Sequence, residues 1–72
     1  MTNGTVKWFS PQMGFGYIAP DRGGADVLVM GGAVDRAGLG DLYDGQKVTY
    51  TGSYDPDDGR TSAMRIKLRE MV

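Results

Sequence analysis

The sequence predicts an all-β domain that closes on itself as a small barrel, and three observations support this fold class. The chain of 72 residues has room for only one small domain, because domains commonly have about 100–150 residues. Its 12 glycines and 3 prolines are spread along the chain, which is typical of tight turns between short elements. No segment has the sustained periodicity of a helix long enough to cover a sheet, so the strands must close on themselves. We expect a single domain over residues 1–72.

Three strands are predicted in the first half of the chain. Residues 5–10 are rich in β-branched and aromatic side chains and stop at Pro11, which cannot continue a strand ladder. Residues 14–19 alternate glycine with large side chains as far as Pro20, and a glycine-rich turn leads to the apolar run at 26–30. These segments predict short strands joined by tight turns.

The second half begins irregularly and ends in two further strands. Residues 31–45 contain many glycines and aspartates, so we expect a long loop with one helical turn. Residues 46–51 alternate in period two, and the turn-forming residues 55–59 separate them from the run at 60–70. In this last run, apolar and basic residues interleave: Met64, Ile66 and Leu68 with Arg65, Lys67 and Arg69. Both segments are predicted to be amphipathic strands.

Composition excludes several classes of function. The chain has no cysteine and no histidine, which removes disulfides, the usual zinc ligands and the commonest general base. We therefore expect neither an enzyme nor a metal or other cofactor, and a domain this small cannot enclose a deep pocket for a small-molecule substrate. No apolar run approaches the ~20 residues that cross a bilayer, and no signal peptide is recognised, so we expect a cytoplasmic protein without a membrane partner.

The charge balance leaves two interpretations of the basic residues open. A net charge of −1 and a pI near 5.0 argue against a nucleic-acid binder that depends mainly on neutralising phosphates. Half of the eight basic residues nevertheless fall in the last thirteen positions, namely Arg60, Arg65, Lys67 and Arg69. They either steer a nucleic-acid backbone along one edge or form a solvated strand face.

The aromatic residues are concentrated near the N-terminus. Four of the seven lie within ten positions: Trp8, Phe9, Phe15 and Tyr17. Residues two apart in a strand share a face, so Phe15 and Tyr17 form a pair, and Gly16 between them leaves the opposite side thin. Such a pair suits the stacking of flat bases, which needs little positive charge. Filling of the barrel interior by the same rings is the alternative, and the pattern alone does not decide between the two.

Four segments of the chain resemble the bacterial cold-shock domain. They read G-T-V-K-W-F at residues 4–9, G-F-G-Y-I at 14–18, D-V-L-V at 26–29 and D-G-Q-K-V at 44–48. The first two in this order and spacing are hard to obtain by chance, and together the segments cover nearly the whole chain. The resemblance implies a five-stranded antiparallel OB-fold barrel that binds single-stranded RNA and DNA.

The resemblance also implies roles for individual residues. It assigns base stacking to Trp8, Phe15 and Tyr17, and a contact with backbone phosphate to Lys7. It further implies that Val6 is buried and Trp8 exposed, although strict alternation along a strand puts both on one face. We therefore expect a β-bulge or a strong twist near Lys7.

The sequence departs from the family pattern on the same surface. A basic residue that usually precedes the first motif is replaced by Met13, and the second motif, V-F-V-H and a large residue in the family, reads V-L-V-M-G at residues 27–31. Leu28 and Met30 still share a face and are included in the predicted site, while Gly31 loosens the strand end. Losing two or three stacking contacts at roughly 1 kcal/mol each lowers affinity about thirty- to a hundredfold.

Two functions follow from these observations. The first is binding of single-stranded RNA or DNA with low sequence preference, in the manner of an RNA chaperone that opposes RNA secondary structure, at reduced affinity. The alternative is a protein-interaction module on a barrel that has largely lost nucleic-acid binding, with an apolar patch made by Met13, Leu28, Met30 and Gly31. We expect a monomer, with self-association through edge strands left open.

Overall fold

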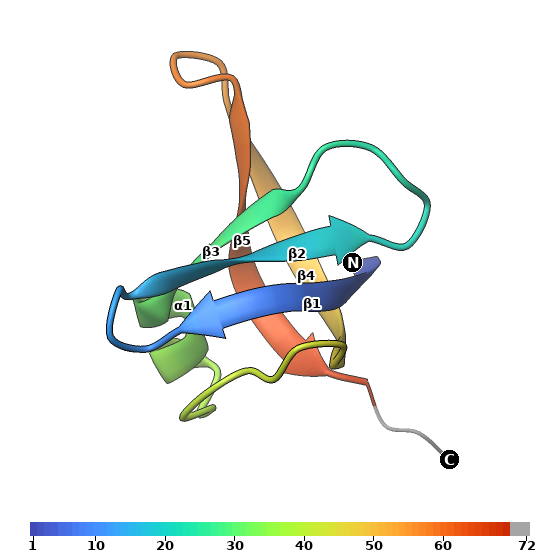
Figure 1. The fold of residues 1–72 in the computed structure, drawn as a ribbon. Helices are drawn as coiled ribbons and strands as arrows, with labels where there is room; N and C mark the ends of the chain where they lie inside the picture. The colour runs from blue at the N-terminus through green and yellow to red at the C-terminus, as the bar shows by residue number, and fades with distance from the viewer. Residues whose placement is uncertain (70–72) are drawn as a thin grey trace.

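The computed structural model describes residues 1–69 and contains five strands and one short helix (Figure 1). In chain order the elements are β1 (Thr2–Ser10), β2 (Phe15–Pro20), β3 (Val27–Met30), α1 (Gly31–Arg36), β4 (Lys47–Asp55) and β5 (Arg60–Leu68). All five predicted strands are present. β1 starts earlier than predicted, at Thr2, because its first residues pair with β4. Residue 70, the end of the predicted fifth strand, lies outside the described residues.

The strands close into a barrel in the order β1-β2-β3-β5-β4. Four ladders are antiparallel: β1 with β2, β1 with β4, β2 with β3, and β4 with β5. The pairing of β3 with β5 that completes the barrel is parallel and is centred on Leu28 and Ser62. The predicted all-β OB-type barrel is confirmed, and this parallel ladder is the detail that the sequence pattern does not indicate.

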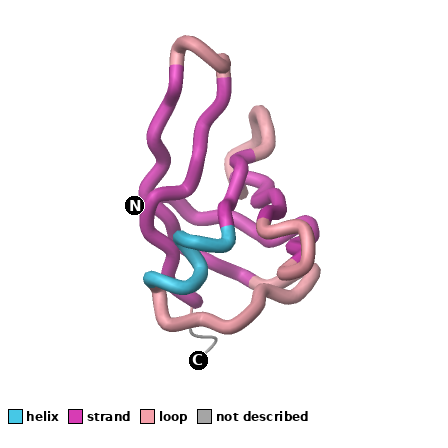
Figure 2. The backbone as a smooth tube through the Cα atoms, turned by 90° about the vertical axis from the view of Figure 1, so that its left-hand side faces the viewer, coloured by secondary structure: helices cyan, strands magenta, loops and turns pink. Residues whose placement is uncertain are grey.

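The hairpin of β4 and β5 extends well beyond the barrel, as Figures 1 and 2 show. Every residue from 51 to 60 is exposed. The predicted turn forms its tip, where the amide of Gly59 donates to the carbonyl of Asp55 at 2.8 Å. β4 is therefore longer than predicted, because its pairing with β5 continues to the end of the hairpin.

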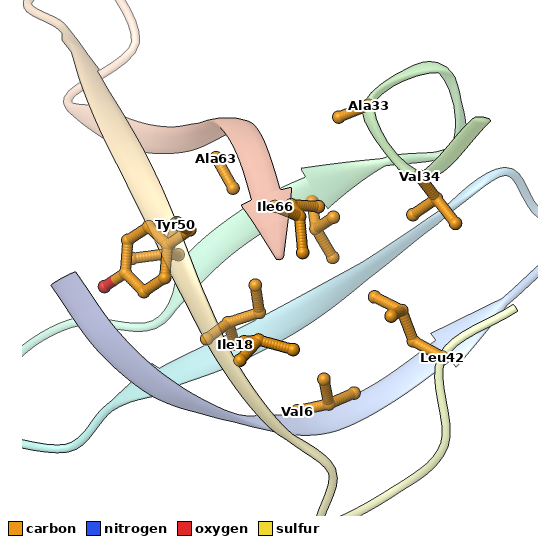
Figure 3. Packing of buried hydrophobic residues seen from close by; sticks show 11 residues of the cluster. Val6, Ile18, Ala33, Val34, Leu42, Tyr50, Ala63 and Ile66 are labelled. Atoms are coloured by element: carbon orange, nitrogen blue, oxygen red, sulfur yellow. The ribbon is translucent and has the colours of Figure 1, made fainter. Parts of the chain in front are cut away.

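The barrel interior is filled by small and medium-sized aliphatic side chains together with the ring of Tyr50 (Figure 3). The buried residues are Val6, Ile18, Val27, Val29, Ala33, Val34, Leu42, Val48, Tyr50, Ala63 and Ile66. They come from all five strands, from α1 and from the loop before β4, and together they form one packed core. Phe15 and Tyr17 are not members of this core.

A β-bulge lies at Lys7, where the sequence predicts a bulge or strong twist. Val6 pairs with Ile18 and Trp8 pairs with Tyr17, so Lys7 is the extra residue between two consecutive pairs. The bulge reverses the alternation, and consequently Val6 is buried whereas Trp8 is exposed. The prediction is confirmed.

A second bulge overturns one detail of the predicted fifth strand. Thr51 pairs with Arg65 and Gly52 with Ala63, which leaves Met64 without a partner on β4. Its side chain is 47% exposed, whereas the apolar alternation predicts that it shares a face with the buried Ile66. The prediction for Met64 is wrong because the bulge shifts the alternation by one residue at this point.

Helix α1 is longer than the single turn expected in residues 31–45, although the rest of that segment is a loop up to β4. It buries Ala33 and Val34 and packs against β3 and β5. Its first residue, Gly31, donates its amide to the carbonyl of Gly14 at 2.8 Å, which ties the end of β3 to the turn between β1 and β2. The strand end that Gly31 was expected to loosen is thus held by a backbone hydrogen bond. With six residues, α1 is also far too short to span a membrane, and it is the one helix within residues 1–69.

Candidate nucleic-acid interface

Three aromatic rings gather on the outer surface of β1 and β2. The ring centroids of Trp8 and Phe15 are 5.4 Å apart, those of Trp8 and Tyr17 5.5 Å, and those of Phe15 and Tyr17 6.1 Å. All three pairs are edge-to-face, with interplanar angles of 65°, 66° and 88°. Edge-to-face packing is a preferred arrangement of aromatic pairs, and all three rings are only partly covered, Trp8 being 36% exposed.

The strand geometry explains why these rings face outward. Trp8 is turned out by the bulge at Lys7 and pairs directly with Tyr17 on β2. Gly16 is buried, and a Cβ at this position would collide with the carbonyl oxygen of Trp8 and lie 2.6 Å from Cα of Phe9. Glycine therefore lets β1 approach β2 closely behind the rings.

Two aliphatic side chains extend this surface onto β3. Leu28 pairs with Tyr17, and Met30 pairs with Phe15. Leu28 is half-buried and Met30 is 50% exposed. We call the outer surface of β1, β2 and β3 the ring face; it carries Trp8, Phe15, Tyr17, Leu28 and Met30. The structure thus brings together all the predicted apolar site residues.

Lys7, the remaining predicted site residue, lies beside the ring face but is engaged within the chain. Its Nζ atom is 3.0 Å from Oδ2 of Asp26, the residue that precedes β3. Asp26 was not among the predicted site residues. Nothing in the local sequence indicates the pair, because its members are 19 positions apart and meet only when β1 and β3 flank β2.

Met13 occupies the position where the family pattern has a basic residue. It is exposed in the turn between β1 and β2, and its backbone amide donates a hydrogen bond to Oγ of Ser10 at 3.2 Å. A thioether therefore stands in this turn where the family pattern has a cationic side chain.

The basic residues of the C-terminal segment differ in their surroundings. Arg65 lines a hollow between α1 and β5, and Lys67 and Arg69 line a second hollow with Thr49 of β4. Arg69 is used structurally, because its Nη2 atom is 3.0 Å from Oδ2 of Asp21 and 3.3 Å from the carbonyl oxygen of Gly4. Steering of a nucleic-acid backbone by these residues stays a prediction.

A polar network around Asp21, which follows β2, links β1, β4 and the end of β5 through hydrogen bonds and an ion pair. Oγ1 of Thr5 donates to Oδ1 of Asp21 at 2.9 Å and accepts from Nζ of Lys47 at 2.7 Å. The hydrogen bond from Thr5 and the nearby charges of Arg69 and Lys47 outweigh partial burial and hold the pKa of Asp21 below its ordinary value of 3.8. Burial, and secondarily the charge of Asp21, raises the pKa of Tyr50 above its ordinary value of 10.

Comparison with known proteins agrees with this geometry. Residues 2–68 match the family model described as the 'Cold-shock' DNA-binding domain. Cold shock protein CspA of Rhizobium meliloti (strain 1021) is 49% identical over 67 residues, which are 93% of this chain and 97% of that protein. The probable cold shock protein y4cH of Sinorhizobium fredii (strain NBRC 101917 / NGR234) is 54% identical over the same shares of both chains. Glycine-rich protein 2 of Nicotiana sylvestris is 43% identical over 63 residues, which are 88% of this chain and 29% of that protein. The chain belongs to the cold-shock domain family.

Proposed function

We propose that this protein binds single-stranded RNA or DNA with low sequence preference, by stacking bases on Trp8, Phe15 and Tyr17. The observation that carries the proposal is the cluster of three rings whose centroids lie within 6.1 Å of one another on an outer strand surface. By holding bases apart from their pairing partners, the protein opposes RNA secondary structure, as an RNA chaperone does. It acts in the cytoplasm as a monomer, without catalysis and without a cofactor.

Stacking reconciles nucleic-acid binding with an acidic protein. Each base stacked on an aromatic side chain contributes about 1–3 kcal/mol, and this contribution depends little on base identity or protein charge. A net charge of −1 therefore reduces electrostatic attraction without removing the main source of affinity. Low sequence preference follows, because every base offers a flat face.

The same surface supports only moderate affinity. Leu28 and Met30 occupy positions on β3 where an aromatic ring would offer a larger stacking area, and Lys7 is partly neutralised by Asp26. We therefore propose weaker binding than in relatives that carry aromatic side chains at these two β3 positions.

A titration of the wild-type protein with fluorescently labelled hexathymidylate and hexauridylate tests the proposal. Phe15→Leu removes one ring from the ring face, and Tyr43→Leu, the matched control, removes an exposed ring from the loop before β4. We expect Phe15→Leu to weaken binding about five- to 150-fold, corresponding to about 1–3 kcal/mol, and Tyr43→Leu to leave it unchanged. Equal affinities for the two variants and the wild type would refute stacking on this face.

A second candidate function is supported by the exposed methionines. Met30 pairs with Phe15, Met13 is exposed in the turn before β2, and both add apolar surface that another protein chain can contact. Under this alternative, Leu28→Asp abolishes association with a partner or with a second copy, and the wild type has negligible affinity for both oligonucleotides. Measurable oligonucleotide binding that is lost in Phe15→Leu would exclude it as the main function.

A further inference from the structure

A hollow of about 370 Å³ lies between α1 and β5, and none of the ring-face residues lines it. Its lining residues are Ala33, Arg36, Ala37, Met64, Arg65 and Ile66. The hollow exists because the bulge in β5 turns Met64 outward while Ala33 and Ala37 present only small side chains on the facing helix end. Its position depends on tertiary packing, so the sequence pattern does not indicate it.

The lining combines an apolar floor with two cationic side chains. Ala33 and Ile66 are buried, and the side chain of Met64 stands beside them with nearly half of its surface exposed. Arg36 and Arg65 are exposed, and neither takes part in the two ion pairs found within residues 1–69. Nε of Arg36 donates to the carbonyl of Gly32 at 3.3 Å, which holds this side chain along α1. Guanidinium groups recognise phosphate oxygens through paired hydrogen bonds.

The positions of Met30 on β3 and Met64 on β5 relate the hollow to the ring face. β3 and β5 run parallel from the pair of Leu28 and Ser62, so Met30 and Met64 each lie two residues beyond that pair on adjacent strands. Both are exposed. Helix α1 starts directly after Met30, and its last residue is Arg36. A chain that leaves Phe15 over Met30 therefore meets Met64 and then the two arginines.

We propose that a single-stranded nucleic acid bound to the ring face continues over Met64 into this hollow, where Arg36 and Arg65 bind its backbone phosphates. The thioether of Met64 packs against the face of one further base, since a sulfur atom makes favourable contacts with aromatic rings. This inference rests on the proposed function and extends its footprint by a second, cationic subsite. Continuity with the ring face favours a nucleic-acid chain over an acidic peptide as the occupant.

The test compares oligonucleotides that do and do not reach the hollow. Affinities of tetrathymidylate and decathymidylate are measured for the wild type, for Arg36→Gln/Arg65→Gln, and for the control Arg22→Gln/Lys67→Gln. The control removes the same two charges at exposed positions that do not line the hollow. The longer oligonucleotide offers more binding registers to every protein equally, so the effect of the hollow is read from the difference between variants.

We expect Arg36→Gln/Arg65→Gln to bind tetrathymidylate like the wild type and decathymidylate about two- to thirtyfold more weakly. The dependence of log affinity on log salt for decathymidylate should also fall by about 1.4, because each lost phosphate contact contributes about 0.7 on a single strand. The control variant should retain wild-type affinity for both. Unfolding temperatures of both variants equal to that of the wild type would show that the change in affinity and in salt dependence does not come from misfolding.

Two outcomes overturn the inference and are distinguishable from failure of the proposed function. Unchanged decathymidylate binding by Arg36→Gln/Arg65→Gln, with tetrathymidylate still bound, would show that the hollow is not used. Equal losses in the two double variants would show a general charge effect. Absence of binding of either oligonucleotide to the wild type would instead refute the proposed function, and the second subsite with it.

Discussion

Lys7, which directly precedes Trp8 in the chain, forms an ion pair with Asp26, with 3.0 Å between Nζ and Oδ2. Both side chains are solvent-exposed, at 52% and 37%. The basic residue that the cold-shock resemblance assigns to a phosphate contact is thus partly neutralised by the protein itself. A phosphate group that binds Lys7 has to compete with Asp26.

Replacing Asp26 should therefore strengthen nucleic-acid binding. An exposed ion pair contributes about 0.2–1 kcal/mol, so Asp26→Asn should raise the affinity for hexathymidylate up to about fivefold and make binding more salt-dependent. Asp44→Asn, which removes a carboxylate from the exposed turn before β4, is the control for net charge. An affinity of Asp26→Asn equal to that of the control would show that Lys7 does not contact the ligand.

An aromatic ring at Leu28 should restore stacking area on β3. Leu28 pairs with Tyr17, so the ring of Leu28→Phe adds to the ring face and should tighten oligonucleotide binding about five- to 150-fold. Thr49→Phe adds a ring to β4, away from β2 and β3, and should have no such effect. If titration shows equal affinity for Leu28→Phe and the wild type, the β3 edge of the ring face does not contact bases.

Alanine substitutions at Gly16 and Gly32 should differ in their effect on stability. A Cβ at Gly16 collides with β1, so Gly16→Ala should lower the free energy of unfolding by about 1–3 kcal/mol or more. A Cβ at Gly32 has no neighbour within 4 Å, and alanine favours a helix by up to about 1 kcal/mol, so Gly32→Ala should be neutral or stabilising. Urea unfolding measures both, and a Gly16→Ala protein as stable as Gly32→Ala would contradict the close approach of β1 and β2.

Acid stability should depend on Asp21. Because the pKa of this carboxyl is lower in the folded protein than its ordinary value of 3.8, the unfolded chain binds more protons in that range. The stabilising effect is fully present above pH 3.8 and is lost as the pH falls through the lower, folded-state pKa.

The free energy of unfolding of the wild type should accordingly decrease more steeply with acidification than that of Asp21→Asn. Urea unfolding at a series of pH values below neutral provides the measurement, with Asp58→Asn in the exposed hairpin turn as the matched loss of one carboxylate. Parallel pH profiles for Asp21→Asn and the wild type would contradict a stabilising role of the network around Thr5.

The two bulges show what sequence reasoning reaches and where it stops. The bulge at Lys7 is predictable because Val6 and Trp8, two positions apart, have opposite environments in the family, whereas strict alternation places them on one face. The bulge at Met64 is not predictable. Met64 is apolar and two positions from Ile66, so the alternation in the sequence looks regular although the register shifts. A bulge can be recognised in the sequence only where the extra residue interrupts the alternation of apolar and polar side chains.

The candidate site divides in the same way. Its aromatic and aliphatic members lie on the neighbouring strands β1, β2 and β3, and the motifs of the cold-shock resemblance predict them as a group, whereas alternation alone leaves open whether the rings face inward or outward. The pairing of Lys7 with Asp26 and the hollow beside Arg36 require the closed barrel, because they join residues that are distant along the chain. The ion pair between Lys7 and Asp26 depends on tertiary structure, so a local sequence pattern does not predict it.

Trp8 is the only tryptophan and lies on the ring face, so its fluorescence reports most directly on the central claim of stacking at this surface. The measurement is a titration of the unlabelled protein with hexathymidylate and hexauridylate at low and at physiological salt. Stacking predicts saturable quenching whose midpoint weakens only modestly with salt. No change in Trp8 fluorescence at high micromolar oligonucleotide would contradict it.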